Sequence, residues 1–226
     1  MQGASVLSDP VRSALSGRQA EFARSRGAAI RFDPECSPFA ALDGRTADAF
    51  GDLSVLADGQ DVWMLTPEPV RIAAKFSIMS QSDCLQMRAD SVTESASRPD
   101  FTELTDADAP DMRELAALTE PGPFLSRTHR LGTFIGIREN GRLVAMAGER
   151  LKPDGFTEMS GVCTHPDSRG RGYAGFLIKE AARRCLGRGE IPFLHCYAAN
   201  TGAVALYEAC GFRTERRMIL TVLRPV

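Results

Sequence analysis

The sequence predicts an α/β protein with two differently patterned halves. A small, polar segment from Asp90 to Asp100, with a proline at position 99, reads as a linker between residues 1–95 and 100–226. Beyond it, apolar stretches with strand spacing alternate with stretches of helical spacing. One strand-to-helix junction there, from His165 to Gly175, is rich in glycine and arginine. These observations predict an accessory domain in the first half and a sheet-and-helix domain in the second.

The first half predicts a small α/β domain without a chemical motif. Trp63 is the only tryptophan of the chain, and packing in the core is its default role. The expected elements are helices at 9–24 and 46–56 and strands at 30–32, 61–65 and 76–79.

The second half has sharper signals. Asn140-Gly141 between two apolar stretches is a strong hairpin signal, and Gly211 closes the last helix. The expected elements, in order, are a strand at 101–104, a helix at 106–119, a short helix ending near 130, strands at 133–138, 142–150 and 156–164, a helix at 176–186, a strand at 191–198, a helix at 201–210 and a strand at 218–223.

The loop before residue 176 predicts a phosphate-binding site. Its glycines let successive backbone N–H groups turn toward one point, and the following helix N-terminus adds partial positive charge. Arg169 and Arg171 favour a polyanionic ligand further.

Two motifs fit this loop. Gly170-x-Gly172-x-x-Gly175 matches a dinucleotide fingerprint, which requires an acidic residue after the next strand and further parallel strands. The next strand, 191–198, is followed by Ala199-Asn200, and its only acid, Glu190, lies at the wrong end. Residues 176–226 are also too few for the further strands. Arg169-x-x-Gly172-x-Ala174 resembles instead the (Q/R)-x-x-G-x-(G/A) motif of GNAT-type N-acetyltransferases. The context favours this second motif over an NAD-dependent oxidoreductase.

The order of expected elements is similar to that of the GNAT fold over residues 100–224. The resemblance implies an α/β GNAT fold, with a central mixed sheet and helices on both faces, preceded by the small α/β N-terminal half. The loop, the hairpin and the tail from Asn200 to Phe212 look most like the glycine-N-acyltransferase-like branch. GNAT domains usually close with two strands after the last helix, but here only one is expected. The other strand is absent, or is supplied by the N-terminal half, or comes from a second subunit in a homodimer.

The resemblance implies acetyl-CoA as co-substrate. The loop would bind its pyrophosphate, and Gly161 in mid-strand marks the bulge at which the family frees backbone groups for the pantetheine arm. The cofactor-binding residues that it implies are Val162, Cys163, Thr164, Arg169, Gly170, Arg171, Gly172, Tyr173, Ala174, Asn200 and Ala203.

Two catalytic roles follow from the resemblance. Tyr207 occupies the position of the tyrosine that protonates the leaving thiolate, although simple ring packing would also explain it. Glu158 has the same offset from Arg169 as the glutamate base of histone-acetylating members, and an exposed edge position is the alternative. Glu149 on the neighbouring strand is the reserve base.

The acceptor pocket in this fold points to residues 120–130. Phe124 there offers an apolar wall, and Arg127, His129 and Arg130 could pair with the carboxylate of an amino-acid acceptor or serve only as surface charge. We therefore expect a small-molecule amine or amino-acid acceptor, whose identity the sequence does not give.

Bulk properties restrict the function further. The net charge of −2, with 43% apolar and 25% charged residues, gives no drive toward nucleic acid. No apolar segment is long enough to span a membrane, and six cysteines without a C-x-x-C pair indicate reduced thiols in the cytoplasm. The three histidines lack a metal-ligand spacing. The expected function is a cytoplasmic, acetyl-CoA-dependent N-acetyltransferase, and the alternative is a catalytically silent CoA-binding sensor domain.

Overall fold

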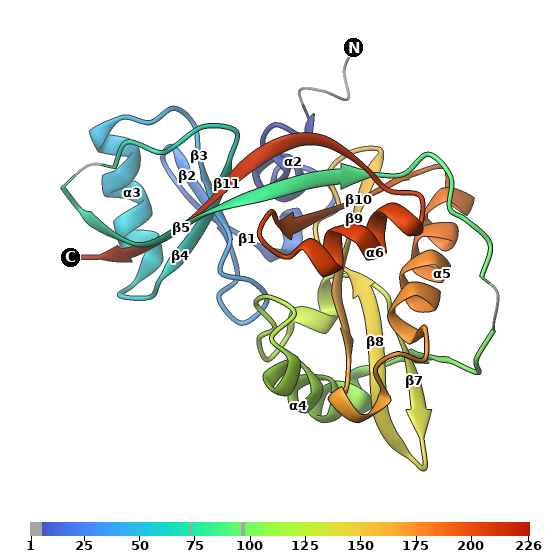
Figure 1. Cartoon of the computed structure of the whole chain (residues 1–226). Coiled ribbons are helices and arrows are strands. Elements are labelled where there is room, and N and C mark those ends of the chain that lie inside the picture. The colour runs from blue at the N-terminus through green and yellow to red at the C-terminus, as the bar shows by residue number, and fades with distance from the viewer. Residues whose placement is uncertain (1–5, 73, 96–97) are drawn as a thin grey trace.

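The computed structural model describes residues 6–72, 74–95 and 98–226 (Figure 1). The first half contains α2 (Pro10–Leu15), a 3-10 turn (Ala20–Phe22), β1 (Ala23–Arg26), β2 (Ala29–Phe32), β3 (Ala40–Leu42), α3 (Ala47–Ala57), β4 (Val62–Thr66) and β5 (Phe76–Arg88). The second half contains β6 (Thr102–Leu104), α4 (Ala109–Thr119), β7 (Phe134–Glu139), β8 (Arg142–Glu149), β9 (Phe156–Thr164), α5 (Tyr173–Gly187), β10 (Ile191–Tyr197), α6 (Thr201–Ala209) and β11 (Arg213–Pro225), with 3-10 turns at Asp106–Asp108, Thr128–Leu131 and Pro166–Ser168.

An eight-stranded sheet passes through both halves in the order β4-β11-β5-β10-β9-β8-β7-β6. It is mixed, because β9 and β10 run parallel while the other neighbours run antiparallel. In Figure 1 the long strands β5 and β11 lie side by side and connect the two ends of the molecule. The expected α/β class with a mixed central sheet is confirmed.

The strand that the second half lacks is β5. It pairs with β10 on one side and with β11 on the other, so the N-terminal half supplies it from the same chain. A second subunit is therefore not needed to complete the sheet, and the homodimer stays a prediction. The division into domains at 1–95 and 100–226 also stays a prediction, and the sheet crosses it.

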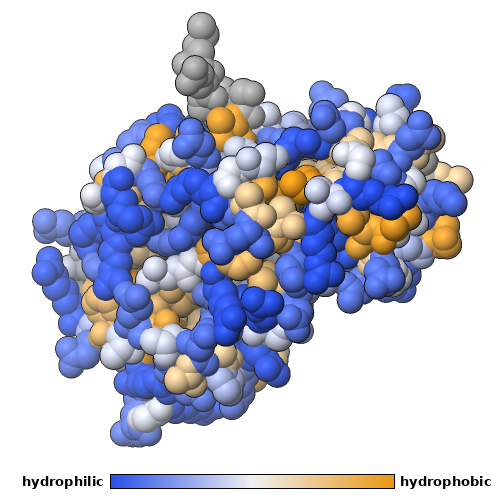
Figure 2. All heavy atoms as spheres, turned by 180° about the vertical axis from the view of Figure 1, so that it is seen from behind, coloured by the Kyte–Doolittle hydropathy of each residue, from blue (hydrophilic) through white to orange (hydrophobic). Residues whose placement is uncertain are grey.

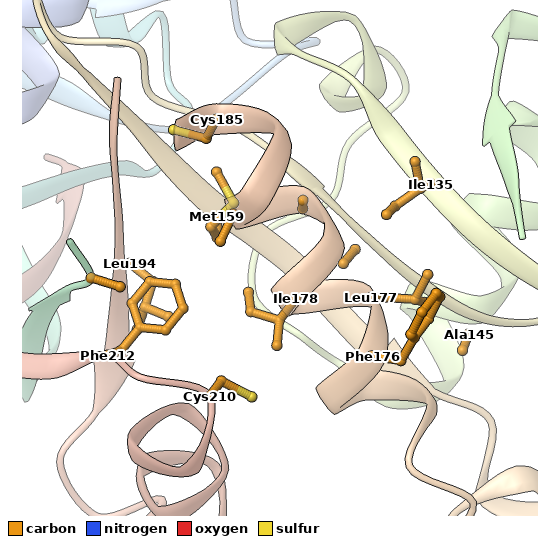
Figure 3. Close-up of a cluster of buried hydrophobic side chains, with 14 of the residues drawn as sticks. Ile135, Ala145, Met159, Phe176, Leu177, Ile178, Cys185, Leu194, Cys210 and Phe212 are labelled. Atoms are coloured by element: carbon orange, nitrogen blue, oxygen red, sulfur yellow. The ribbon is translucent and has the colours of Figure 1, made fainter. Parts of the chain in front are cut away.

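Helices cover both faces of the sheet because neighbouring residues of a strand point to opposite sides. Ile135 packs with the cluster formed by α5, whereas Phe134 packs with Met112 of α4. Figure 3 shows Phe176, Leu177 and Ile178 of α5 among the side chains of the first cluster. The helix carries six buried residues on this face, which are Phe176, Leu177, Ile178, Ala181, Ala182 and Cys185.

The first half is not packed as a separate body. Its small sheet has the order β1-β2-β3, and α2 covers it. Val11 of α2 belongs to the same buried cluster as Phe193 of β10 and Met218 of β11. The N-terminal elements are thus part of the core that supports the strands of the second half.

The structure corrects several expected element boundaries. The predicted helix at 9–24 is too long, because α2 ends at Leu15 and the chain is extended from Ala23. Gly17, a weak helix former, follows the observed end. Strand β3 was not expected, while β5 and β11 are much longer than predicted, because they pair with each other over almost their full length.

The surface shown in Figure 2 is mainly hydrophilic, with apolar atoms in small, separate areas. No helix in the described residues is long and apolar enough to cross a membrane. Within the same residues, no group of three or more potential metal-ligating side chains gathers in one place. All six cysteines are buried and free of disulfides.

Candidate active site

Strands β9 and β10 separate in the middle of the sheet. They pair only from Ile191 opposite Phe156 to Phe193 opposite Glu158, and β10 then continues along β5. The register of β9 against β8 shifts close to Gly161, whose φ of 62° is one that glycine tolerates. This confirms the expected bulge and leaves residues 162–164 of β9 without a β10 partner.

A cleft opens where β9 leads into α5, and we call it the loop cleft. Gly170 and Gly172 each have a φ of 78°, and a Cβ at either position would enter open space. Gly172 is the N-cap of α5, so the first N–H groups of that helix face the loop. Such a turn binds anions through backbone donors and the helix dipole.

The loop cleft has a volume of about 630 Å³. Every predicted cofactor-binding residue lines it except Arg171, which instead pairs with Glu139 at 2.7 Å. The Tyr173 hydroxyl donates to the same carboxylate at 2.7 Å, so Glu139 fastens the loop to β7. The lining of the loop cleft comprises Thr119, Val162, Cys163, Thr164, Ser168, Arg169, Gly170, Gly172, Tyr173, Ala174, Gly175, Asn200, Gly202, Ala203, Leu206 and Tyr207.

A second space, the inner cavity, adjoins the loop cleft and has a volume of about 220 Å³. Part of its wall comes from the first half of the chain, through Phe39, Trp63, Leu65 and Cys84. The two spaces share five lining residues, which are Thr119, Val162, Asn200, Ala203 and Tyr207.

An outer cavity of about 970 Å³ continues the inner cavity. It is lined by α4 and the loop that follows it. It shares five lining residues with the inner cavity, which are Trp63, Glu120, Gly122, Pro123 and Tyr197. The inner cavity therefore has two neighbours, one holding the glycine loop and one reached along α4.

Tyr207 and Asn200 lie at the junction of the loop cleft and the inner cavity. Burial raises the pKa of the Tyr207 hydroxyl, which therefore stays protonated at neutral pH. Its ring packs edge-on against Phe212, with 6.2 Å between centroids. Asn200 caps α6 by accepting a hydrogen bond from the Ala203 N–H at 3.1 Å. Tyr207 is therefore placed both to donate a proton and to pack its ring, and Asn200 both to contact a cofactor and to cap α6.

Glu158 is fully buried and lines neither cavity. Arg150 donates to it through Nε and Nη2, each at 2.8 Å, and His195 Nδ1 lies 2.7 Å from it. Burial alone would raise its pKa, but the charge and hydrogen bonds of Arg150 and the bond from His195 outweigh it and hold the pKa at about 2. The predicted base is enclosed in an ion pair, and this geometry argues against its taking a proton from an acceptor.

The reserve base is enclosed as well. Glu149 pairs with Arg188 at 2.6 Å and Lys152 at 2.9 Å, and it lines none of the three spaces. Burial would raise its pKa, but these two cations lower it overall.

Of residues 120–130, which the sequence predicted to form the acceptor pocket, only some line a cavity. Glu120 and the following Pro121–Pro123 line the inner cavity, and Phe124 lines the outer one. Arg127 lies 3.4 Å from Glu35, and both His129 and Arg130 contact Asp106. None of these three side chains lines the loop cleft, the inner cavity or the outer cavity, so they pair with carboxylates outside the site.

Sequence reasoning missed a buried polar network beneath the inner cavity. Gln86 Nε2 donates to Leu7 O at 2.9 Å and faces His195 Nε2 at 3.0 Å. His195 Nε2 therefore accepts, and its Nδ1–H donates to Glu158. Gln86 is on β5 and Arg150 follows β8, so no local spacing could link them. The only sign of this network in the sequence was Arg150, a charged residue at the end of the apolar strand β8.

Comparisons with known proteins agree with this geometry. A family model described as FR47-like protein matches residues 134–220. A solved structure from Novosphingobium aromaticivorans DSM 12444, assigned as an acetyltransferase from the GNAT family, is 42% identical, with a TM-score of 0.90 over 97% of this chain and 98% of that one. No match was found among curated proteins.

More distant structures share the fold alone. A GCN5-related N-acetyltransferase from Kribbella flavida is 15% identical, with a TM-score of 0.63 over 95% of both chains. A GCN5-related N-acetyltransferase-like protein from Streptococcus suis 89/1591 is 16% identical, with a TM-score of 0.56 over 82% of this chain and 78% of that one. With the close relative, the splayed strands and the glycine loop, the chain belongs to the GNAT family and is an N-acetyltransferase.

Proposed function

We propose that the protein moves the acetyl group of acetyl-CoA to a primary amine by direct attack of the amine on the thioester. The meeting of the loop cleft and the inner cavity at five shared residues carries this proposal. A thioester reaching the junction along β9 would lie next to an amine in the inner cavity. Holding two reactants in this way converts a bimolecular step into an effectively unimolecular one.

The loop cleft fits coenzyme A. Gly170 and Gly172 leave room for a pyrophosphate beside the N-terminus of α5, and Arg169 lines the same cleft. The hydroxyl of Thr164 is buried there without a hydrogen-bond partner in the described part of the chain, so it is free to bond a ligand. Acetyl-CoA would supply the activated acyl group.

Tyr207 is the proposed acid. When the amine nitrogen bonds to the carbonyl carbon, the C–S bond breaks, and the departing thiolate takes a proton. Tyr207 lines both spaces, and burial raises the pKa of its hydroxyl, which therefore carries its proton at neutral pH. A thiol, with an ordinary pKa of about 8.5, is a stronger acid than a phenol at about 10, so the proton passes to sulfur only as the C–S bond breaks, and solvent then reprotonates the tyrosinate.

The proton of the attacking amine needs an acceptor other than Glu158. We assign it to the exposed Glu120, which lines both the inner and outer cavities and whose carboxylate has no hydrogen bond or ion pair in the described residues. Its backbone is left-handed, with φ 47°, because Glu120 is the C-cap of α4, where helices commonly end in this conformation. A free carboxylate there can accept the proton directly or through one water.

Thiol release from acetyl-CoA, measured across primary amines, tests this function. Amine-dependent release supports it, whereas coenzyme A binding without release from any amine would leave the sensor domain as the better description. The free, buried cysteines support a cytoplasmic location, which remains a proposal, as does the glycine-N-acyltransferase-like branch.

A further inference from the structure

The inner cavity is lined by an arginine, Arg150, whose guanidinium group has hydrogen-bond donors without a partner in the described residues. The Arg150 side chain is 9% exposed and lines the cavity. Glu158 occupies one edge of its guanidinium group, through Nε and Nη2. Of the five N–H donors of an arginine, three then remain, two on Nη1 and one on Nη2. No other hydrogen bond of these nitrogens occurs among the described residues.

The free donors form the second edge of the guanidinium group. That edge matches the two oxygens of a carboxylate, which arginine binds with two parallel hydrogen bonds. The Phe39 ring lies 4.8 Å from the guanidinium carbon and restrains its plane. The site is thus built and fixed before any ligand arrives.

Glu158 neutralises the charge of Arg150 but leaves this edge free to donate hydrogen bonds. Its carboxylate lies at the opposite edge and accepts from Arg150, from His195 and, at 3.3 Å, from the Leu151 N–H. With these donors its oxygens are satisfied from their own side. A second carboxylate on the cavity side would meet donors that nothing else uses.

The inner cavity also offers a place for an ammonium group. Glu120 lines the same small space and has no partner in the described residues. An unpaired carboxylate and the open edge of an arginine in one cavity are complementary to a molecule carrying both charges. Phe39, Leu65 and Leu220 add apolar surface to the same wall, which suits an apolar side chain.

We propose that Arg150 is a specificity-determining residue that binds the carboxylate of the acceptor, and that the acceptor is a compact α-amino acid with an apolar side chain. This inference rests on the proposed function. The acceptor reaches the cavity from the outer side, along α4, while the acyl donor occupies the loop cleft. Arg150 replaces the surface cations at 127–130 in the role that the sequence suggested for them.

The test compares leucine, leucinamide and 3-methylbutan-1-amine as acceptors, with thiol release from acetyl-CoA as the readout. The wild-type protein should prefer leucine to the other two by about 10² or more in kcat/KM, because the open edge of Arg150 stays unpaired without a carboxylate. Glycine should be poorer than leucine, since it leaves the apolar wall unfilled.

Arg150→Gln alone would strand the buried charge of Glu158, so the decisive variant is the double change Arg150→Gln/Glu158→Gln, which removes both charges together. The leucine preference should fall to about threefold or less, mostly through KM, while the thermal shift caused by coenzyme A is kept. Arg150→Lys, which has no fork, should lose most of the preference too. Arg127→Gln, on the surface, is the matched control and should keep it.

Several outcomes overturn the inference. Equal rates for leucine and leucinamide, or a preference that survives the double change, would remove the carboxylate from Arg150. Loss of the preference in Arg127→Gln alone would show that the surface loop, and not Arg150, binds the carboxylate of the acceptor. A preference of the wild-type protein for succinyl-CoA over acetyl-CoA that only the double variant loses would place the carboxylate on the acyl group. No thiol release from any amine would refute the proposed function itself, and calorimetry showing no leucine binding to the coenzyme A complex would reject the arginine site separately.

Discussion

Replacing Glu158 by glutamine separates a structural role from a catalytic one. The carboxylate has no exposed surface and makes two 2.8 Å bonds to Arg150. Glutamine keeps the size but removes the charge, and its amide presents only one oxygen to the two donors. Breaking a buried ion pair on one side costs about 3–5 kcal/mol, because the remaining charge is left uncompensated.

The size of the effect makes it measurable by thermal unfolding. For a chain of about this length, 1 kcal/mol moves Tm by roughly 2–4 °C, so Glu158→Gln should lower Tm by about 10 °C. Arg150→Gln/Glu158→Gln should recover most of that loss, because neither charge remains. For the enzyme that stays folded at 20 °C, kcat should change far less than the roughly 10² expected for a lost base.

The opposite pattern would refute this reasoning. If Tm is unchanged in Glu158→Gln while kcat falls about 10²-fold and recovers at high pH, the carboxylate is the base that the sequence predicted. If the double change is no more stable than Glu158→Gln, the two side chains are not coupled in the way that the distances indicate.

Four other outcomes are expected. Tyr207→Phe should lower kcat roughly 10²-fold with little change in coenzyme A affinity by calorimetry, and normal kcat would leave Tyr207 with packing alone. Gly172→Val should abolish the stabilisation by coenzyme A, about 2.7 kcal/mol at 100 times Kd, whereas Gly189→Val, which has a similar φ of 77° but lies outside the cleft, should keep it. Because folding depresses the pKa of Glu158, its contribution to the free energy of unfolding is complete above about pH 4.3 and is lost as the pH falls toward about 2. Acid unfolding curves should show this loss as about 3 kcal/mol in the wild-type protein and should not show it in Arg150→Gln/Glu158→Gln. Trp63→Ala should raise KM for the amine at least several-fold without changing KM for acetyl-CoA, and equal changes in both would place the first half outside the acceptor wall.

The parts of the structure that local sequence dictates were predictable. The hairpin at Asn140-Gly141, the bulge at Gly161 and the glycine loop each depend on a few neighbouring residues with particular backbone preferences. The cleft residues followed from the loop and the strand before it, because they lie within a few positions of those glycines.

What could not be predicted depends on contacts between distant segments. Glu158 had the offset of a base, but its ionisation is decided by Arg150, which follows β8, and by His195 on β10, 37 residues away. Trp63 lines the inner cavity only because its strand, β4, joins the far end of the same sheet. Long-range pairing of this kind leaves no periodic signal in either segment.

The position of β5 between β10 and β11 also constrains how the chain is made. Gln81 donates to Thr221 from 140 residues away, and the contacts along these two strands all have similarly long separations. During synthesis β5 leaves the ribosome well before β10 and β11, so both of its edges stay unpaired until those strands are made. Pairing strands that are so far apart in sequence is slow, so the last steps of folding take place only after β11 has been made. An enzyme truncated before Arg213 would therefore lose β11, which is one of the two strands that pair with β5.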